Sequence, residues 1–212
     1  MFNFSIFPPP ETANEDGLVA VGGDYSPFML LEAYSNGIFP WFEEKGLIFW
    51  YSPDPRFVIF REDFRIGKRL LRYYKKHNYT ITMNENFPAV MRYCQLVKRK
   101  EGSTWITDRM IEGYTKLFNL GFGLSVEVWN GKKLVGGLYG VLIGKYFCGE
   151  SMFSLEKNAS KFAFIKLAEV LFYEKNFKFI DCQVHSEVME RFGGKNIPRK
   201  EFLKILKRAI SG

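Results

Sequence analysis

Acidic and amide side chains follow two strand-like segments of the sequence and could bind or activate a ligand. Glu150 lies in residues 149–154, directly after the first segment, and Asp181 and Gln183 follow the second segment, residues 177–180. One predicted helix joins the two segments, so together they form a βαβ unit. If the strands lie side by side, the three side chains face one cavity at the strand ends, a common position for ligand chemistry in α/β folds.

The composition is typical of a globular protein. The 212 residues can form one or two domains with a sizeable core, and 47% hydrophobic with 25% charged residues is an ordinary balance. No run of eighteen apolar residues is present, and the first ten residues lack the basic and apolar regions of a secretory signal. We therefore expect a cytoplasmic protein with no membrane span.

Cysteine and histidine usage predicts neither disulfides nor a metal site. The three cysteines, Cys94, Cys148 and Cys182, are far apart in the sequence, and only two histidines are present. Without a secretory signal, this pattern indicates reduced thiols, and it leaves too few soft ligands for zinc. We expect no bound metal.

Residues 65–77 predict an amphipathic helix with one wholly cationic face. A second face, formed by Ile66, Leu70, Tyr73 and His77, is apolar. Surface helices usually mix acids with bases, whereas cations alone repel each other unless an anion neutralises them. With the net charge of +7, this pattern favours phosphate binding over a merely solvated surface. The cationic face consists of Arg65, Lys68, Arg69, Arg72, Lys75 and Lys76.

Residues 1–60 predict a small N-terminal α/β domain. Ser26 and Pro27 have the residue types of a helix start, so we expect a helix over 27–35. Residues 39–42 are expected to form a loop, and residues 47–51 a short strand.

Residues 61–212 predict a larger domain with a mixed sheet. Three antiparallel strands are expected between residues 124 and 152, followed by a helix and then by the strand at 177–183, inserted beside the last of them. This is the layout of an N-acyltransferase-like (GNAT-like) domain. The fold class is therefore α/β (α+β), with two domains.

Two alternative functions follow from this layout and from the charge. A coenzyme A-dependent N-acetyltransferase would carry a glycine-rich pyrophosphate loop before the long helix, but residues 154–161 contain no glycine. A non-catalytic RNA-binding module would not need the polar cluster at the strand ends. The nucleotide-binding and hydrolase motifs GxGxxG, GxxxxGK[ST] and GxSxG are also missing from the positions that they require.

A series of short motifs resembles the leucyl/phenylalanyl-tRNA–protein transferase family. Each motif is short, but their joint order, from about residue 7 to about residue 202, is very specific. The motifs are Gly17–Leu18, Gly22–Asp24, Gly37–Trp41, Trp50–Arg56, Thr104–Ile106, Ser125–Trp129, Val135–Gly140, Gly149–Ser154, Asn158–Lys161 and Ile180–Gln183.

This resemblance implies a bacterial cytoplasmic enzyme of the N-degron pathway. It would move Leu or Phe from an aminoacyl-tRNA to the α-amino group of an acceptor protein that begins with Arg or Lys, and so mark that protein for degradation. The ester of the donor is already activated, so we expect no cofactor.

The resemblance gives the acidic cluster its chemistry. An α-amino group has an ordinary pKa near 8, so the site has to hold it in its neutral form and remove a proton after attack. Asp181 and Gln183 are suited to orient the amine and relay the proton, with positioning as the larger role of Asp181. Glu150 would fix these two residues or pair with the cationic side chain of the acceptor. A structural hydrogen bond is the alternative for each acid.

The resemblance also assigns substrate-binding residues. Phe164, Leu167 and Leu171 recur at i, i+3 and i+7, which by periodicity alone indicates ordinary core. The family pattern implies that this helix face and Leu138 line the pocket for the donor side chain, and Ser154 is placed with them. Trp50 and Trp105 are candidates to stack on the terminal adenine, while Trp41 and Trp129 are expected in the core. The six cations of residues 65–77 would bind the tRNA backbone.

Overall fold

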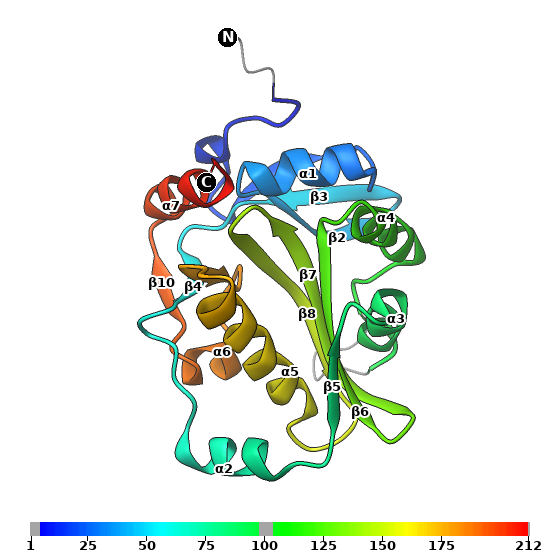
Figure 1. Cartoon of the computed structure of the whole chain (residues 1–212). Coiled ribbons are helices and arrows are strands. Elements are labelled where there is room, and N and C mark those ends of the chain that lie inside the picture. The colour runs from blue at the N-terminus through cyan, green and yellow to red at the C-terminus, as the bar shows by residue number, and fades with distance from the viewer. Residues whose placement is uncertain (1–4, 98–103, 212) are drawn as a thin grey trace.

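A computed structural model of the chain describes residues 5–97 and 104–211. It contains two sheets (Figure 1). The smaller sheet is antiparallel, in the order β1-β3-β2, and consists of β1 (Leu18–Val21), β2 (Phe39–Glu44) and β3 (Leu47–Tyr51). A single 3-10 turn, Pro10–Thr12, precedes it.

The larger sheet has seven strands in the order β10-β4-β9-β8-β7-β6-β5. Neighbouring strands are antiparallel except for β8 and β9, which are parallel. The strands are β4 (Arg56–Phe60), β5 (Thr80–Met83), β6 (Gly123–Asn130), β7 (Lys133–Ile143), β8 (Tyr146–Ser154), β9 (Phe179–Asp181) and β10 (Lys195–Ile197).

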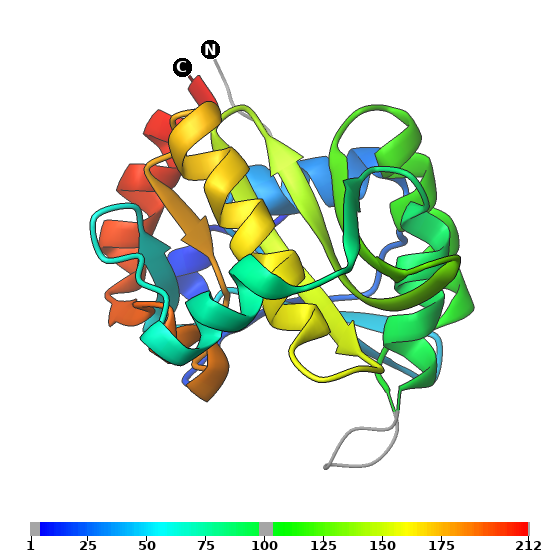
Figure 2. The same cartoon turned by 60° about the horizontal axis from the view of Figure 1, so that its bottom comes forward.

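Helices cover both faces of the larger sheet. On one face lies α5 (Ala159–Ala168), which continues as the π-helical segment Glu169–Glu174, and α2 (Lys68–Lys76) crosses over it (Figure 2). The other face packs against α3 (Phe87–Leu96) and α4 (Asp108–Asn119). Across the described ranges, every helix is too short or too polar to traverse a bilayer.

The remaining helices lie around the smaller sheet and the edge of the larger one. Helix α1 (Pro27–Ser35) contacts α7 (Arg199–Ser211), and both lie with the smaller sheet at the end of the molecule opposite α2 (Figure 1). The short α6 (Glu187–Arg191) follows β9.

The predicted strand order of the larger domain is confirmed. Strands β6, β7 and β8 form the antiparallel meander, α5 follows, and β9 returns parallel to β8. The start of α1 is also confirmed, because the Ser26 hydroxyl accepts a hydrogen bond from the N–H of Met29. The helix ends before Gly37, whose φ of 74° is a conformation that glycine adopts without strain.

Two predictions about the N-terminal region are wrong. Residues 39–42 belong to strand β2 rather than to a loop, and Pro40 is tolerated there because β2 is an edge strand whose register shifts between Pro40 and Phe42. Strand β4 pairs with β9 and β10, so the predicted domain boundary at residue 60 separates a strand from its own sheet.

The cationic helix is shorter than predicted. Arg65 lies before α2, and its guanidinium donates to the carbonyl of Glu190, so only five of the six cations share the helix. The apolar face uses Tyr74 rather than Tyr73. The ring of Tyr74 packs on Phe162 at 5.5 Å, whereas Tyr73 is 45% exposed.

Gly37 gives a test of how tightly α7 packs on the end of α1. A Cβ at Gly37 would lie 2.8 Å from Leu203 and 2.9 Å from Phe202, whereas a Cβ at Gly46, which also has positive φ, would meet nothing within 4 Å. Gly46→Ala should therefore cost only the backbone strain, about 1–2 kcal/mol. Gly37→Ala should cost about 1–3 kcal/mol more, because α7 has to move. Urea unfolding measures both, and equal losses would contradict close packing of α7.

Candidate active site

A cavity of about 260 Å³ lies beside β8, where β9 ends. The two strands share a single register pair, Cys148 with Asp181, and β8 then continues to Ser154 without β9 beside it. Residue Gln183 has a φ of 64°, which turns the chain away from the line of the strand. The space that opens next to β8 holds all three predicted polar residues on its wall.

Asp181 is held by a buried ion pair. Its carboxylate accepts hydrogen bonds from Arg56 Nε at 2.9 Å and Arg56 Nη2 at 2.7 Å, and both side chains are fully buried. The hydroxyl of Tyr146 donates to Asp181 Oδ2 at 2.6 Å, and the N–H of Gln183 donates to Oδ1 at 2.9 Å. These four donors occupy the acceptor positions of the carboxylate. The carboxylate of Asp181 therefore has no acceptor position left for a further hydrogen bond.

Gln183 connects Asp181 to Glu150. Its side-chain Nε2 donates to Glu150 Oε1 at 2.8 Å and lies 3.2 Å from Cys148 Sγ. Asp181 therefore fixes the backbone of Gln183, and Glu150 fixes its side-chain amide nitrogen. The predicted cluster of Glu150, Asp181 and Gln183 is thus brought together by the structure.

Glu150 is the group in this cluster that can titrate near neutral pH. The loss of water around its carboxyl group raises the pKa of Glu150 to about 7, although a hydrogen bond from Tyr34 opposes the rise. The hydroxyl of Tyr34 donates to Oε1 at 2.7 Å, and the hydroxyl of Tyr114 lies 3.3 Å from Oε2. The two hydroxyls are 2.5 Å apart. Glu150 itself is only half-buried and faces the cavity.

Part of the cavity lining is apolar. Leu138, Phe164 and Leu167, three of the predicted pocket residues, line the cavity and belong to one hydrophobic cluster, which we call the apolar wall. Leu171 does not line the cavity. It lies in the π-helical segment after α5 and is buried in the core.

Ser154 also lies away from the cavity. It is exposed, and its hydroxyl donates to the carbonyl of Glu156 and accepts from the N–H of Ser160 at the start of α5. The predicted substrate contact of Ser154 is therefore wrong, and its role is to close the turn into α5.

Trp41 and Trp50 each lie where the other was predicted to lie. Trp50 is 1% exposed, its ring packs against Phe7 at 4.9 Å, and its Nε1 donates to the carbonyl of Gly22, so no ring face is free for a base. Trp41, expected in the core, is half-buried and lines the cavity together with Trp105.

The sequence analysis missed several residues of the site, among them Tyr34, Tyr114, Tyr146 and Arg56. Tyr34 and Tyr114 come from α1 and α4, and no local pattern connects either tyrosine to residue 150. Arg56 lies at the end of a motif used for the family resemblance, but nothing in the sequence shows that it is buried. Within the part of the chain that the structure describes, no group of three or more His, Cys, Asp or Glu side chains could hold a metal ion.

Comparisons with known proteins identify the family of the chain. The family description "Leucyl/phenylalanyl-tRNA protein transferase" matches residues 58–207, and the description of its N-terminal domain matches residues 23–54. Among solved structures, a GCN5-related N-acetyltransferase from Kribbella flavida aligns with 80% of this chain and 60% of its own, at 8% identity and a TM-score of 0.43.

Curated relatives match over almost the whole length. The leucyl/phenylalanyl-tRNA–protein transferase of Flavobacterium johnsoniae is 47% identical over 208 residues, which covers 98% of each chain. The protein of that name from Shewanella piezotolerans is 48% identical over 208 residues, covering 97% of this chain and 88% of its own. With both domains matched, the chain belongs to the leucyl/phenylalanyl-tRNA–protein transferase family.

Proposed function

We propose that this protein transfers Leu or Phe from an aminoacyl-tRNA to the α-amino group of proteins that begin with Arg or Lys, in the cytoplasm, and so marks them for degradation. The observation that carries the proposal is a cavity lined both by the apolar wall and by the Gln183–Glu150 pair. The family relation supports an aminoacyl-tRNA as donor and a protein as acceptor.

The proposed reaction forms one bond and breaks one bond. The neutral amine nitrogen attacks the ester carbonyl carbon, the C–N bond forms, and the bond from that carbon to the ribose oxygen breaks. The nitrogen loses one proton and the ribose oxygen gains one. A protein group therefore only has to hold the proton between these two events.

Glu150 is the proposed proton acceptor. A general base works best when its pKa lies near the working pH, and the pKa of Glu150 is raised to about 7. Asp181 is unsuited to this role because its oxygens are already occupied by Arg56, Tyr146 and the N–H of Gln183. We assign Gln183 the task of orienting the amine toward the ester, with its backbone fixed by Asp181 and its side-chain amide by Glu150.

The apolar wall is proposed to hold the side chain of the donor. Leu138, Phe164 and Leu167 form a dry surface that matches Leu or Phe. Trp41 and Trp105, which line the same cavity, are candidates to stack on the terminal adenine.

Helix α2 is proposed to bind the tRNA backbone. Its five cations, Lys68, Arg69, Arg72, Lys75 and Lys76, are exposed. In residues 5–97 and 104–211, none of them forms an ion pair with a carboxylate. Unpaired cations on one helix are available to phosphates, whose neutralisation releases counterions.

A transfer assay tests the function directly. Phe-tRNA and a peptide that begins with Arg should give a peptide extended by Phe, whereas the same peptide beginning with Ala should react poorly. Acetyl-CoA offered in place of the tRNA tests the acetyltransferase alternative. Binding of tRNA without transfer to any peptide would indicate an RNA-binding module and contradict the proposal.

Glu150→Gln should lower transfer without disturbing the fold. A glutamine can still accept from Tyr34 and Gln183, but it cannot take up a proton, and loss of a general base costs about 100-fold or more. In the wild type, transfer should rise with pH through about 7, as Glu150 loses its proton. Transfer rates measured between pH 5.5 and 8 test this rise. If Glu150→Gln turns over as fast as the wild type, Glu150 is not the proton acceptor.

The variant Tyr34→Phe tests whether the ionisation of Glu150 causes this limb, the rise of the transfer rate with pH. The Tyr34 hydroxyl donates to the ionised carboxylate and lowers its pKa, so its removal should move the limb of the rate profile to higher pH. A profile that keeps its midpoint would show that another group governs the rise.

Asp181→Ala should act mainly through stability. It leaves Arg56 buried without its partner, which typically costs about 3–5 kcal/mol. Removal of both charges, by Arg56→Met with Asp181→Leu, should restore much of the stability but not transfer, because the N–H of Gln183 loses its acceptor. Urea unfolding measures the effect on stability, and transfer rates measure the effect on activity. If Asp181→Ala is as stable as the wild type, the ion pair does not have the proposed structural role.

Selection of the donor should be steric and hydrophobic. An apolar pocket distinguishes side chains that differ by one methylene by about 1–3 kcal/mol, so Val-tRNA should react about 10- to 200-fold more slowly than Leu-tRNA. The measurement is transfer from each charged tRNA at equal concentration. Equal rates would contradict the assignment of Leu138, Phe164 and Leu167 to the donor pocket.

A further inference from the structure

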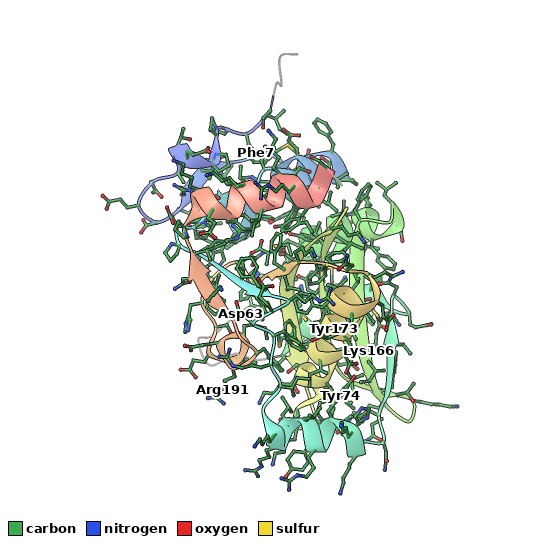
Figure 3. The ribbon with its side chains drawn as sticks, turned by 60° about the vertical axis from the view of Figure 1, so that its left-hand side comes forward. Phe7, Asp63, Tyr74, Lys166, Tyr173 and Arg191 are labelled. Atoms are coloured by element: carbon green, nitrogen blue, oxygen red, sulfur yellow. The ribbon has the colours of Figure 1, made fainter. Side chains whose placement is uncertain are left out.

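A second hollow, of about 630 Å³, lies between α2, the start of α5 and α6. Five cations from these elements and their flanking residues line it, and among the described residues no acid does. We call it the cationic groove, defined by Lys68, Arg69, Lys157, Lys161 and Arg191, with Tyr73 beside them. Figure 3 shows Arg191 on the side of α6 that lies toward α2.

The charges of the cationic groove are not neutralised within the described chain. None of its five cations forms an ion pair with a carboxylate there, although nearby Lys195 and Lys166 do, at 2.6 Å to Asp63 and 4.0 Å to Glu174. A hydrogen bond from Arg69 and the charges of Arg69 and Lys157 lower the pKa of the exposed Tyr73 hydroxyl, as expected beside unneutralised cations. Cations from three separate elements therefore converge on one place without a counter-charge.

The cationic groove shares a wall with the active-site cavity. The rings of Phe164, which lines the cavity, and Phe192, which lines the groove, pack at 4.9 Å. Lys161 and Phe164 are one turn apart on α5, about 4.5 Å along the axis. Two packed rings, both almost fully buried, therefore lie between the cavity and the groove.

We propose that the cationic groove binds the phosphates of the single-stranded 3′ end of the aminoacyl-tRNA. This inference rests on the proposed function, in which the terminal aminoacyl-adenosine occupies the cavity. The nucleotides joined to that adenosine carry phosphates, and the groove offers cations on the other side of the contact between Phe164 and Phe192. Tyr73, 45% exposed, offers a ring on which one of their bases can stack. The double-stranded stem follows along the exposed cations of α2.

The test compares two RNA probes with two charge-reversal variants. The probes are an acceptor-stem hairpin that carries the single-stranded 3′ end and the same hairpin with a blunt end. Lys161→Glu with Arg191→Glu changes the groove and leaves α2 intact. Lys204→Glu with Arg208→Glu, on α7 at the opposite end of the molecule, makes the same change in net charge and is the matched control (Figure 1).

The groove variant should bind the hairpin with the 3′ end more weakly than the wild type. Its plot of log binding constant against log salt concentration should be less steep by about 1.4, because two contacts to single-strand phosphates are lost. Binding of the blunt hairpin, and of both probes by the α7 variant, should match the wild type. An equal loss for both hairpins, or no loss for either, would overturn the proposal.

Transfer from an aminoacyl-adenosine, which has no phosphate, separates this inference from the proposed function. If the groove variant loses this reaction as well, the groove supports the cavity structurally and the proposal fails. If the wild type binds the hairpins as expected but transfers nothing from Phe-tRNA, the proposed function fails, and the groove remains an RNA-binding surface.

Discussion

The buried ion pair between Arg56 and Asp181 is the interaction on which the rest of the structure depends. It joins β4 to β9, and a third guanidinium nitrogen donates to the carbonyl of Gly37 at the end of α1. The guanidinium also lies over the rings of Phe39 and Phe202, at 4.9 and 4.4 Å. Burying two charges is costly, and only a bidentate geometry with every hydrogen bond formed offsets that cost. Both sheets and the C-terminal helix therefore meet around one cation.

The chemistry depends on this ion pair through Gln183. Asp181 holds the backbone of Gln183 in a left-handed conformation, and that conformation turns the side-chain amide toward Glu150. The other side of Glu150 is set by Tyr34, which belongs to the N-terminal region. Two parts of the fold therefore surround the carboxyl group of Glu150, and the site needs both of them.

Local patterns predicted the elements better than the orientation of single side chains. The capping of α1 by Ser26 and the strand order around α5 follow from residue types and spacing that act over a few positions. The exchange of Trp41 and Trp50 could not be predicted, because which face of a strand is covered depends on what packs there. The prediction for Leu171 relied on an unbroken α-helical period, whereas Leu171 lies in a π-helical segment and does not line the cavity.

Arg56 and Asp181 are 125 residues apart along the chain. This distance limits the order in which the protein can fold. During synthesis, β4 emerges long before β9, and domains tend to begin folding at their N-terminal end. To bury Arg56 before Asp181 arrives would leave an uncompensated charge in the core, at a cost of several kcal/mol. Closure of the sheet around Arg56 therefore waits for a late segment, and an incomplete chain that already carries the cationic helix has no assembled catalytic centre.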